Sequence, residues 1–304
     1  MKEKIQTIIS VSIGLLLVAF SIYALDASGG QFTASMENDI FIHSGGKHSD
    51  DDYSNGARFE YLMDNKFGLA FGQSMYTPPD LTISEDQYGY RQYAGYLYLE
   101  GNYRRTPFEF GALQLGFIGD NSFAEQTQKT VHKWIGSRDP KGWDNQIEGH
   151  GVEAQAYYKW THHIIQSEYY YLTPTFTLSG GSVNAIATPG IYNYLCFNHV
   201  PSFNDGLHVT ETRGIDNNFS KLSSWIPSVY LFVGAECDVV GYNYFLDAKE
   251  STVDKKYVVG EFSTGIGLEL RGVIAKFTYL FKTKEYDEQD NLAHFGAITV
   301  GYCF

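Results

Sequence analysis

The segment GAITVGYCF at residues 296–304 alternates between two kinds of side chain. Ile298 and Val300 fall on one face of an extended chain, whereas Ala297 and Thr299 fall on the other. A period of two residues predicts a β-strand, and an apolar face opposite a face of small side chains is typical of a strand in a membrane-spanning barrel. We therefore interpret this segment as a barrel strand with lipid on one side.

The preceding segment, residues 271–283, repeats this alternation, because Phe277 and Tyr279 are interleaved with Lys276 and Thr278. The chain ends on Phe304. A last strand with a terminal aromatic residue resembles the carboxyl-terminal signal of bacterial outer-membrane proteins, which the barrel assembly machinery uses. An ordinary hydrophobic edge strand is the alternative.

Similar segments recur along the chain and predict an all-β fold, a transmembrane antiparallel β-barrel of about twelve strands. The predicted strands cover residues 31–43, 53–64, 66–76, 91–103, 107–118, 148–160, 164–178, 183–198, 228–248, 257–269, 271–283 and 293–304. An even number agrees with bacterial barrels. We expect a bulge within 228–248 and a short helix within 200–227.

With both ends of the barrel in the periplasm, long extracellular loops are expected at residues 44–52, 77–90, 119–147, 249–256 and 284–292. The longest contains the sequence FAEQTQKTVHKWIG. Its apolar positions Phe123, Val131, Trp134 and Ile135 are compatible with a short amphipathic helix.

The chain starts with MKEK followed by the apolar run IQTIISVSIGLLLVAFSIYA, which is the pattern of a secretory signal peptide. We expect the signal peptide to cover residues 1–24, with cleavage between Ala24 and Ala27, and the barrel to occupy residues 28–304. A retained membrane anchor is the alternative. No second apolar run reaches the roughly 18 residues of a spanning helix, so a membrane location requires strands.

Composition supports this class of protein. Aromatic residues make up 16% of the chain, and its 24 Tyr and 21 Phe suit pleated surfaces and aromatic girdles. The formal net charge of −13 argues against nucleic acid as a partner and suits a surface that recruits divalent cations. Cys196, Cys237 and Cys303 show no zinc-binding spacing and are interpreted as small wall residues.

The chain contains no GxSxG, HExxH or Walker A sequence, so any chemistry must come from scattered residues. The predicted topology brings several polar residues to the outer rim of the barrel. They are Asn38 and Asp39 at the end of the first strand, Ser54 at the start of the second, Arg91 at the start of the fourth, and His132 in the loop after the fifth. Each alone has an ordinary explanation as a turn or surface residue. Together they indicate a site.

The segments ENDIF, YSNGARFEY, RQYAGYLYL, QKTVHKWIG, PKGWDNQ and TKEYDEQ follow one another in an order and spacing that resembles the lipid A 3′-O-deacylase family of outer-membrane barrels. The resemblance covers nearly the whole mature chain. It implies dependence on Ca²⁺ and hydrolysis of the acyl groups esterified at the 3′ position of lipid A. It also implies that the essential histidine is His132 and that the polar site residues are Asn38, Asp39, Ser54, Arg91 and Gln128.

The chemistry of these side chains agrees with such roles. His132 can accept a proton from water near neutral pH, and Gln128 precedes it by one helical turn, which places both on one face. Asn38 and Asp39 offer the hard oxygen ligands that Ca²⁺ prefers, and the ion would polarise the ester carbonyl. His132, Asn38, Gln128 and Ser54 are therefore our catalytic candidates, with Asn38 and Asp39 as metal ligands.

The remaining assignments concern the substrate and the attacking group. Arg91 is suited to a phosphate of lipid A, and we expect Tyr93, in the same segment, to contact substrate. Ser54 can hold the attacking water or donate to the oxyanion. A covalent acyl-enzyme on Ser54, with His132 as the base, is the competing mechanism.

Two other functions stay open. An outer-membrane phospholipase also combines a barrel, calcium and ester hydrolysis, and a non-catalytic barrel such as a porin, an adhesin or an inactive homologue would keep only the fold. In each case the expected location is the bacterial outer membrane. The expected partner of the deacylase is the lipopolysaccharide of the outer leaflet, which an active site at the extracellular rim would reach.

Overall fold

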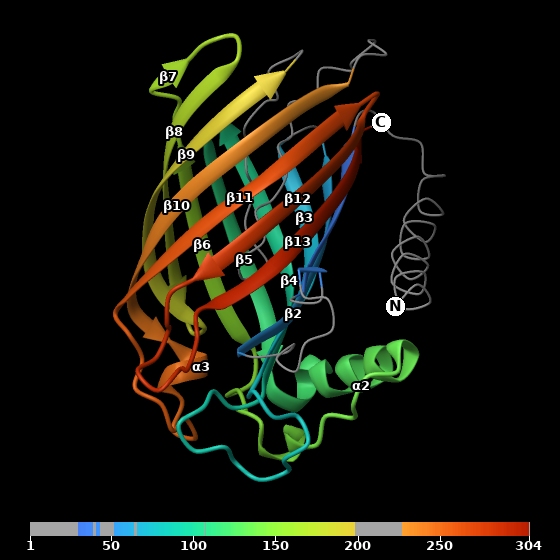
Figure 1. Cartoon of the computed structure of the whole chain (residues 1–304), viewed down its shortest axis with the longest axis vertical. Helices are drawn as coiled ribbons and strands as arrows, with labels where there is room; N and C mark the ends of the chain where they lie inside the picture. Colours follow the sequence, from blue (N-terminus) through green and yellow to red (C-terminus); the bar gives the residue numbers. More distant parts are fainter. Residues whose placement is uncertain are drawn as a thin grey trace.

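The computed structural model describes residues 30–38, 41–42, 52–63, 66–106, 108–197 and 227–303 (Figure 1). The predicted signal peptide, Asp39, the helix expected within 200–227 and Phe304 fall on residues outside this description. No helix among the described residues is long and apolar enough to cross a membrane.

Within the described residues, thirteen strands form one antiparallel sheet. They are β1 (Gly30–Asn38), β2 (Asp52–Met63), β3 (Phe67–Thr77), β4 (Ala94–Thr106), β5 (Glu109–Ile118), β6 (Glu153–Thr161), β7 (Ile165–Gln166), β8 (Tyr170–Gly181), β9 (Asn184–Phe197), β10 (Ser228–Asn243), β11 (Val258–Leu270), β12 (Val273–Lys282) and β13 (Ala293–Cys303). The loops carry η2 (Gly119–Ser122), α2 (Ala124–Ile135), η3 (Gly142–Asn145) and α3 (Tyr244–Asp247).

The sheet closes on itself at two seams. The first strand pairs with the last, from Gln31 opposite Cys303 to Asn38 opposite Gly296. The second seam joins β6 to β8. Because β7 is a two-residue strand beside β8, twelve strands form the ring, which confirms the predicted closed barrel.

Several predicted boundaries differ from the structure, among them that of the strand expected at 148–160, which begins only at Glu153. The strand expected at 164–178 is divided into β7 and β8, and the strand expected at 91–103 begins only at Ala94. The expected bulge occurs between Val240 and Tyr242, but the strand then ends at Asn243 instead of continuing to 248. There the Asn243 side chain accepts a hydrogen bond from the Phe245 N–H and so caps α3, which ends the strand.

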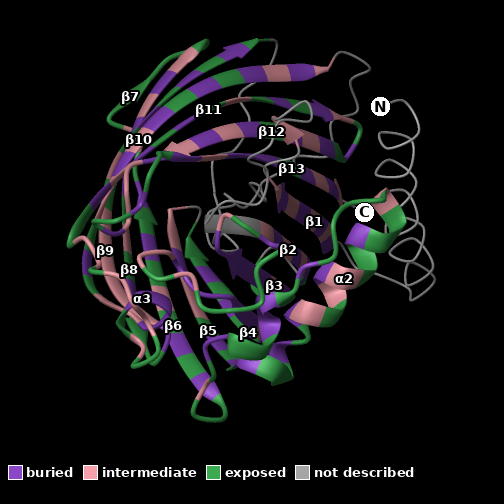
Figure 2. Cartoon of the chain, turned by 60° about the horizontal axis from the view of Figure 1, so that its bottom comes forward, coloured by how far each residue is buried: buried purple, intermediate pink, exposed green. Residues whose placement is uncertain are grey.

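Alternation sorts the side chains between the two faces of the wall (Figure 2). On β12, Val273 and Phe277 are exposed on the outer face, whereas Lys276 and Thr278 are buried in the lumen. On β13, Ile298 is exposed and Thr299 is buried. The apolar outer face and polar lumen are those of a membrane barrel.

Charged side chains fill part of the lumen. Arg58 lies 2.7 Å from Glu100 and 3.1 Å from Glu60, which also accepts from Arg104 at 3.1 Å. All four side chains are buried. A cluster of aromatic side chains and one cysteine packs the inner half, with Tyr171, Tyr192, Tyr194, Cys196, Tyr230 and Phe232. Nearer the outer mouth, a cavity of about 120 Å³ is lined by Tyr76, Tyr96 and Asp238, among others.

Candidate active site

The helix α2 forms where the sequence predicted it and carries two of the catalytic candidates. It is preceded by Phe123, which has a φ of 55°, and ends at Gly136, which has a φ of 69°. Glycine adopts that left-handed conformation without steric cost, so Gly136 is suited to end the helix. Ala124, Gln128 and His132 form its buried face, which confirms that Gln128 and His132 share one face.

This helix begins on the outer wall of the barrel, not in the lumen. On β4, Tyr96 and Tyr98 are buried on the inner side, whereas Leu99 is 66% exposed on the outer side. Gly95 therefore shares the outer side with Leu99. A Cβ atom at Gly95 would lie 2.3 Å from the Cβ atom of Ala124, so only glycine allows α2 to start there.

A second contact fixes the same end of α2. On β3, Gln73 lies on the outer face, because it is two and four residues from the exposed Phe71 and Leu69. Its side chain donates to the backbone carbonyl of Ser122 at 2.6 Å. Figures 1 and 2 show α2 extending sideways from the barrel end, beside β3 and β4 and outside the ring of strands. The candidate residues on α2 thus belong to the face of the barrel that meets lipid.

A small apolar cluster holds the helix against this wall. It contains Met75, Leu81, Tyr93, Ala124 and Trp143. The rings of Tyr93 and Trp143 lie 4.9 Å apart, and Trp143 is 1% exposed. Backbone hydrogen bonds from Lys141 to Leu81 and from Ile147 to Tyr93 tie together the two loops that carry these rings. Tyr93 therefore packs in the cluster that supports Trp143 and the start of α2.

Trp143 also makes a polar contact with the helix. Its indole Nε1–H donates to the Oε1 atom of Gln128 at 2.8 Å. The Nε2 atom of Gln128 is buried and has no hydrogen-bond partner among the described residues. Because the indole can only donate, it fixes which end of the amide is the oxygen and leaves the amide N–H₂ as an available donor.

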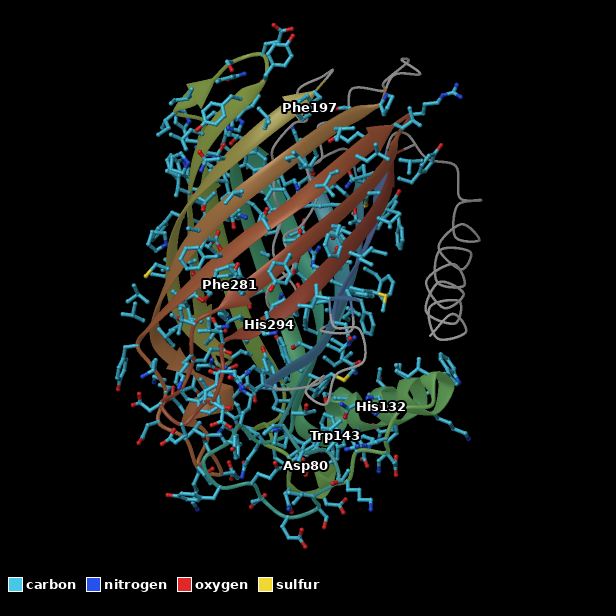
Figure 3. All side chains as sticks on the ribbon, viewed as in Figure 1. Asp80, His132, Trp143, Phe197, Phe281 and His294 are labelled. Atoms are coloured by element: carbon cyan, nitrogen blue, oxygen red, sulfur yellow. The ribbon has the colours of Figure 1, made fainter. Side chains whose placement is uncertain are left out.

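His132 has an equally defined orientation. Its Nδ1 atom lies 2.5 Å from the backbone carbonyl of Arg138, and the ring is 6% exposed. A carbonyl only accepts, so Nδ1 carries a proton, and in the neutral imidazole the lone pair is then on Nε2. Figure 3 shows His132 on α2 and Trp143 in the loop segment below it, at the barrel end opposite Phe197.

Of the candidates on the first two strands, Asn38 lies on the outer wall of the barrel. Asn38 is the last residue of β1 and is directly opposite Asn55 of β2. Asn38 lies on the outer face of the strand, because the alternate residues Ser35 and Glu37 are buried on the lumen side. The backbone of Ser54 belongs to β2, but its side chain, like the whole of Asp39, is outside the described residues. Two strand spacings separate β1 from β3, or roughly 10 Å.

Arg91 lies in a different cluster. Its guanidinium is 3.1 Å from the carboxylate of Glu285 and 4.5 Å from the ring centroid of Tyr76, which lines the lumen cavity. The side chain is 1% exposed. Burial would raise the pKa of Glu285, but Arg91 and Lys282 outweigh burial and hold that pKa below its usual range. The structure therefore separates Arg91, at the lumen mouth, from Gln128 and His132.

Metal ligands are less completely described. Among the residues that the structure describes, no three His, Cys, Asp or Glu side chains come close enough together to hold a metal ion. The amide oxygens of Asn38 and Asn55 suit calcium chemically, since Ca²⁺ accepts neutral amide and carbonyl oxygens. A carboxylate for such a site would have to come from outside these residues, and Asp39 is the adjacent candidate.

Two features of the site were absent from the sequence interpretation. One is Trp143, which lies in the quoted segment PKGWDNQ but was given no role. The other is the position of the site on the outer wall, although the alternation of side chains along the strands indicates it. Asn38 and Gln73 are polar, and Gly95 has no side chain, at positions where most outward residues of each strand are apolar.

Comparisons with known proteins agree with this architecture. Residues 9–304 match the family described as outer membrane protein LpxR. The structure resembles LpxR from Salmonella typhimurium with a TM-score of 0.71 and 22% identity, covering 90% of this chain and 99% of that one. It also matches the β domain of the Bordetella autotransporter BrkA, with a TM-score of only 0.42 and 11% identity, covering 92% and 100% of the two chains. No curated protein sequence matches. Because the family match spans nearly the whole chain, this protein belongs to the LpxR family of outer-membrane proteins.

Proposed function

We propose that this protein is a calcium-dependent hydrolase that removes the 3′-linked acyl or acyloxyacyl group from lipid A. Family membership supports a lipid A-modifying enzyme of the outer membrane. One observation carries the proposal further. An oriented histidine and a glutamine with an unpartnered donor lie together on the face of α2 that packs at the outer wall of the barrel, beside the surface that lipid covers.

His132 acts as the general base in this proposal. Its Nε2 atom takes a proton from water as the water oxygen attacks the ester carbonyl carbon. The tetrahedral intermediate then collapses, the bond to the sugar oxygen breaks, and the proton on Nε2 passes to that oxygen. The products are a free fatty acid and the 3′ hydroxyl of lipid A. The Arg138 carbonyl supports the imidazolium that forms between these steps, because it accepts from Nδ1.

Gln128 stabilises the developing negative charge. Its Nε2–H₂ group donates to the carbonyl oxygen, while Trp143 holds the Oε1 end of the amide. Preoriented donors of this kind typically contribute a factor of about 10² to 10³ in rate. Ser54 holds the water or donates to the same oxygen, and nucleophilic attack by Ser54 is the alternative.

Asn38 and Asp39 would hold the calcium ion, which supplies polarisation of the ester carbonyl when bound. Arg91 would bind a phosphate only if it shared or released Glu285, since their ion pair is buried. A contact between Arg91 and the substrate therefore requires this ion pair to rearrange.

Mass spectrometry of lipid A incubated with the purified protein tests the proposal. We expect loss of 3′-linked acyl mass with the natural chain, no loss with His132→Ala, and normal loss with His150→Ala, an exposed histidine of the same loop. A calcium chelator should stop the reaction. Unchanged lipid A with fatty acid released from added phospholipid would instead identify a phospholipase.

The side chains that fill the lumen argue against a porin. Buried ion pairs and the aromatic cluster occupy it across several strands. A planar bilayer recording is therefore expected to show no stable ion conductance. Stable conductance together with unchanged lipid A would contradict the enzyme proposal.

A further inference from the structure

The helix α2 has an apolar stripe that its packing on the barrel does not use. Phe123 is 57% exposed, Val131 38% and Trp134 58%. With the half-buried Thr127, they recur at intervals of four, four and three residues, so they share one side of the helix. Single exposed apolar residues need no explanation, but a stripe of them on one short helix does.

This stripe lies beside the buried face of α2, not opposite it. At 3.6 residues per turn, the buried face of Ala124, Gln128 and His132 is adjacent to the side of Val131 and Trp134. Charged and polar residues, among them Lys129 and Lys133, occupy the rest of the circumference. The apolar and buried sides of the helix together are thus wider than the part that packs against the barrel. This is also the case in helices that lie at a membrane surface.

The backbone at Phe123 is a second, independent observation. Its φ of 55° lies in the left-handed region, which bulky side chains rarely adopt. A glycine would satisfy this turn without strain. The turn instead holds a large apolar ring, more than half exposed, at the point where the helix leaves the wall. Strain of this kind is retained where a side chain has a use.

The position of the helix identifies what covers the stripe. The start of α2 is fixed to the outer wall at Gly95 and Gln73. Further along the same wall, Leu69 and Leu99 are 61% and 66% exposed, and this apolar wall is the surface that outer-membrane lipid covers. A helix attached to that wall at the rim therefore extends into the plane of the surrounding leaflet.

We propose that Phe123, Val131 and Trp134 lie in the interfacial layer of the outer leaflet and anchor α2 to the lipid surface. Tryptophan suits this layer, because its ring is apolar and its N–H can still bond to water or headgroups. The contact with lipid stands on its own. Its consequence, that the anchor holds His132 and Gln128 at the depth of a lipid ester, rests on the proposed function.

Tryptophan fluorescence tests the contact without any activity. The full chain is reconstituted in vesicles of phosphatidylcholine with plain or brominated acyl chains, and the contribution of Trp134 is the emission lost in Trp134→Phe. We expect brominated lipid to quench this contribution by at least about twofold, as for a side chain placed at the acyl boundary. Trp160→Phe is the positive control, because Trp160 lies on the outer face of β6 and is 37% exposed.

Tyr88→Trp is the matched negative control. Tyr88 is 86% exposed in the loop between β3 and β4 and lies on no apolar stripe. A tryptophan there should escape quenching. If the Trp134 contribution is as insensitive to bromine as this control, the proposed lipid contact is wrong.

A second experiment addresses the catalytic consequence. Trp134→Glu places a charge in the interface, and we expect turnover of lipid A embedded in vesicles to fall about tenfold, equivalent to about 1.4 kcal/mol. Turnover of detergent-dispersed lipid A should stay within about twofold, since there is no bilayer surface in which the helix must lie. Equal losses in both assays would overturn the anchoring role. If the natural chain hydrolyses neither, the proposed function fails while the fluorescence result still decides the lipid contact.

Discussion

Removal of the indole N–H from Trp143 probes the proposed site at its most defined contact. Trp143→Phe keeps an aromatic ring against Tyr93, 4.9 Å away, but removes the donor that lies 2.8 Å from Gln128. The Oε1 atom of Gln128 is then left without this partner in a buried environment. We expect the amide to turn or shift, so that its Nε2–H₂ group no longer faces the substrate carbonyl.

The expected loss of rate follows from the free-energy cost of leaving the Oε1 atom of Gln128 without its hydrogen-bond donor. An unsatisfied buried polar group costs about 1–3 kcal/mol, and each 1.36 kcal/mol changes a rate by about tenfold. Trp143→Phe should therefore lower kcat by roughly 5- to 150-fold, with ~10-fold as the central value. Gln128→Ala removes the oxyanion donor itself and should cost about 10² to 10³. KM should change little in either variant.

A double-mutant cycle provides the assay and the refutation. Lipid A deacylation is measured by mass spectrometry for Trp143→Phe, Gln128→Ala and the combined variant, with Trp160→Phe as a control for loss of a tryptophan. Because Trp143 acts through Gln128, the combined variant should be no slower than Gln128→Ala alone. If the two losses multiply, or if Trp143→Phe raises KM at constant kcat, Trp143 does not position the amide.

Three further predictions concern the wall, the lumen mouth and the lumen. Gly95→Leu should displace α2, because the new Cβ would lie 2.3 Å from that of Ala124, and should reduce deacylation by more than about 100-fold. The barrel should still show its heat-dependent shift on electrophoresis, and Gly101→Leu, which meets nothing within 4 Å, should be nearly normal. Since Arg91 helps to hold the pKa of Glu285 below its usual range, their ion pair stabilises the loop above that range and loses this contribution as the pH falls through the folded pKa. The protection factors of the amides in residues 283–292, corrected for the intrinsic pH dependence of hydrogen exchange, should therefore fall on acidification, and Glu285→Gln should flatten the response. Arg58→Ala leaves buried carboxylates uncompensated and should lower the free energy of unfolding by about 3–5 kcal/mol in denaturant titrations. An unchanged midpoint would show that water already screens the lumen charges.

The barrel was accessible from sequence because its signal is local and repeated. Alternation in segments such as 296–304 depends only on lipid outside and polar groups inside, so each strand reports the fold separately. The helix in the 119–147 loop was predictable for the same reason, since its pattern is contained in one segment. The predicted strand ends were wrong where a specific side-chain contact, and not the alternation, ends the strand. Asn243, which caps α3, is an example.

The partners of the site residues were not accessible in this way. Arg91 pairs with Glu285, 194 residues away, and its choice between a phosphate and a carboxylate depends on loops that meet only in the folded protein. Trp143 follows Gln128 by 15 residues, but nothing in its own segment indicates a hydrogen bond to the helix. Sequence thus identified the chemically capable residues, and only the fold separates Arg91 from His132.

Placement of the site on the outer wall gives the packed lumen a role in catalysis. A base and a donor must keep their positions to within a fraction of an ångström, which requires a rigid support. Here Arg58 of β2 reaches across to Glu100 of β4 inside the barrel, and this ion pair spans β3 between them. The outer faces of β3 and β4 carry Gln73 and Gly95, on which α2 rests. Loss of the lumen ion pair should therefore slow deacylation even though Arg58 has no proposed contact with the substrate, and Arg58→Ala should reduce kcat at temperatures well below unfolding. Full activity of a folded Arg58→Ala barrel would show that α2 is held by its own loop contacts alone.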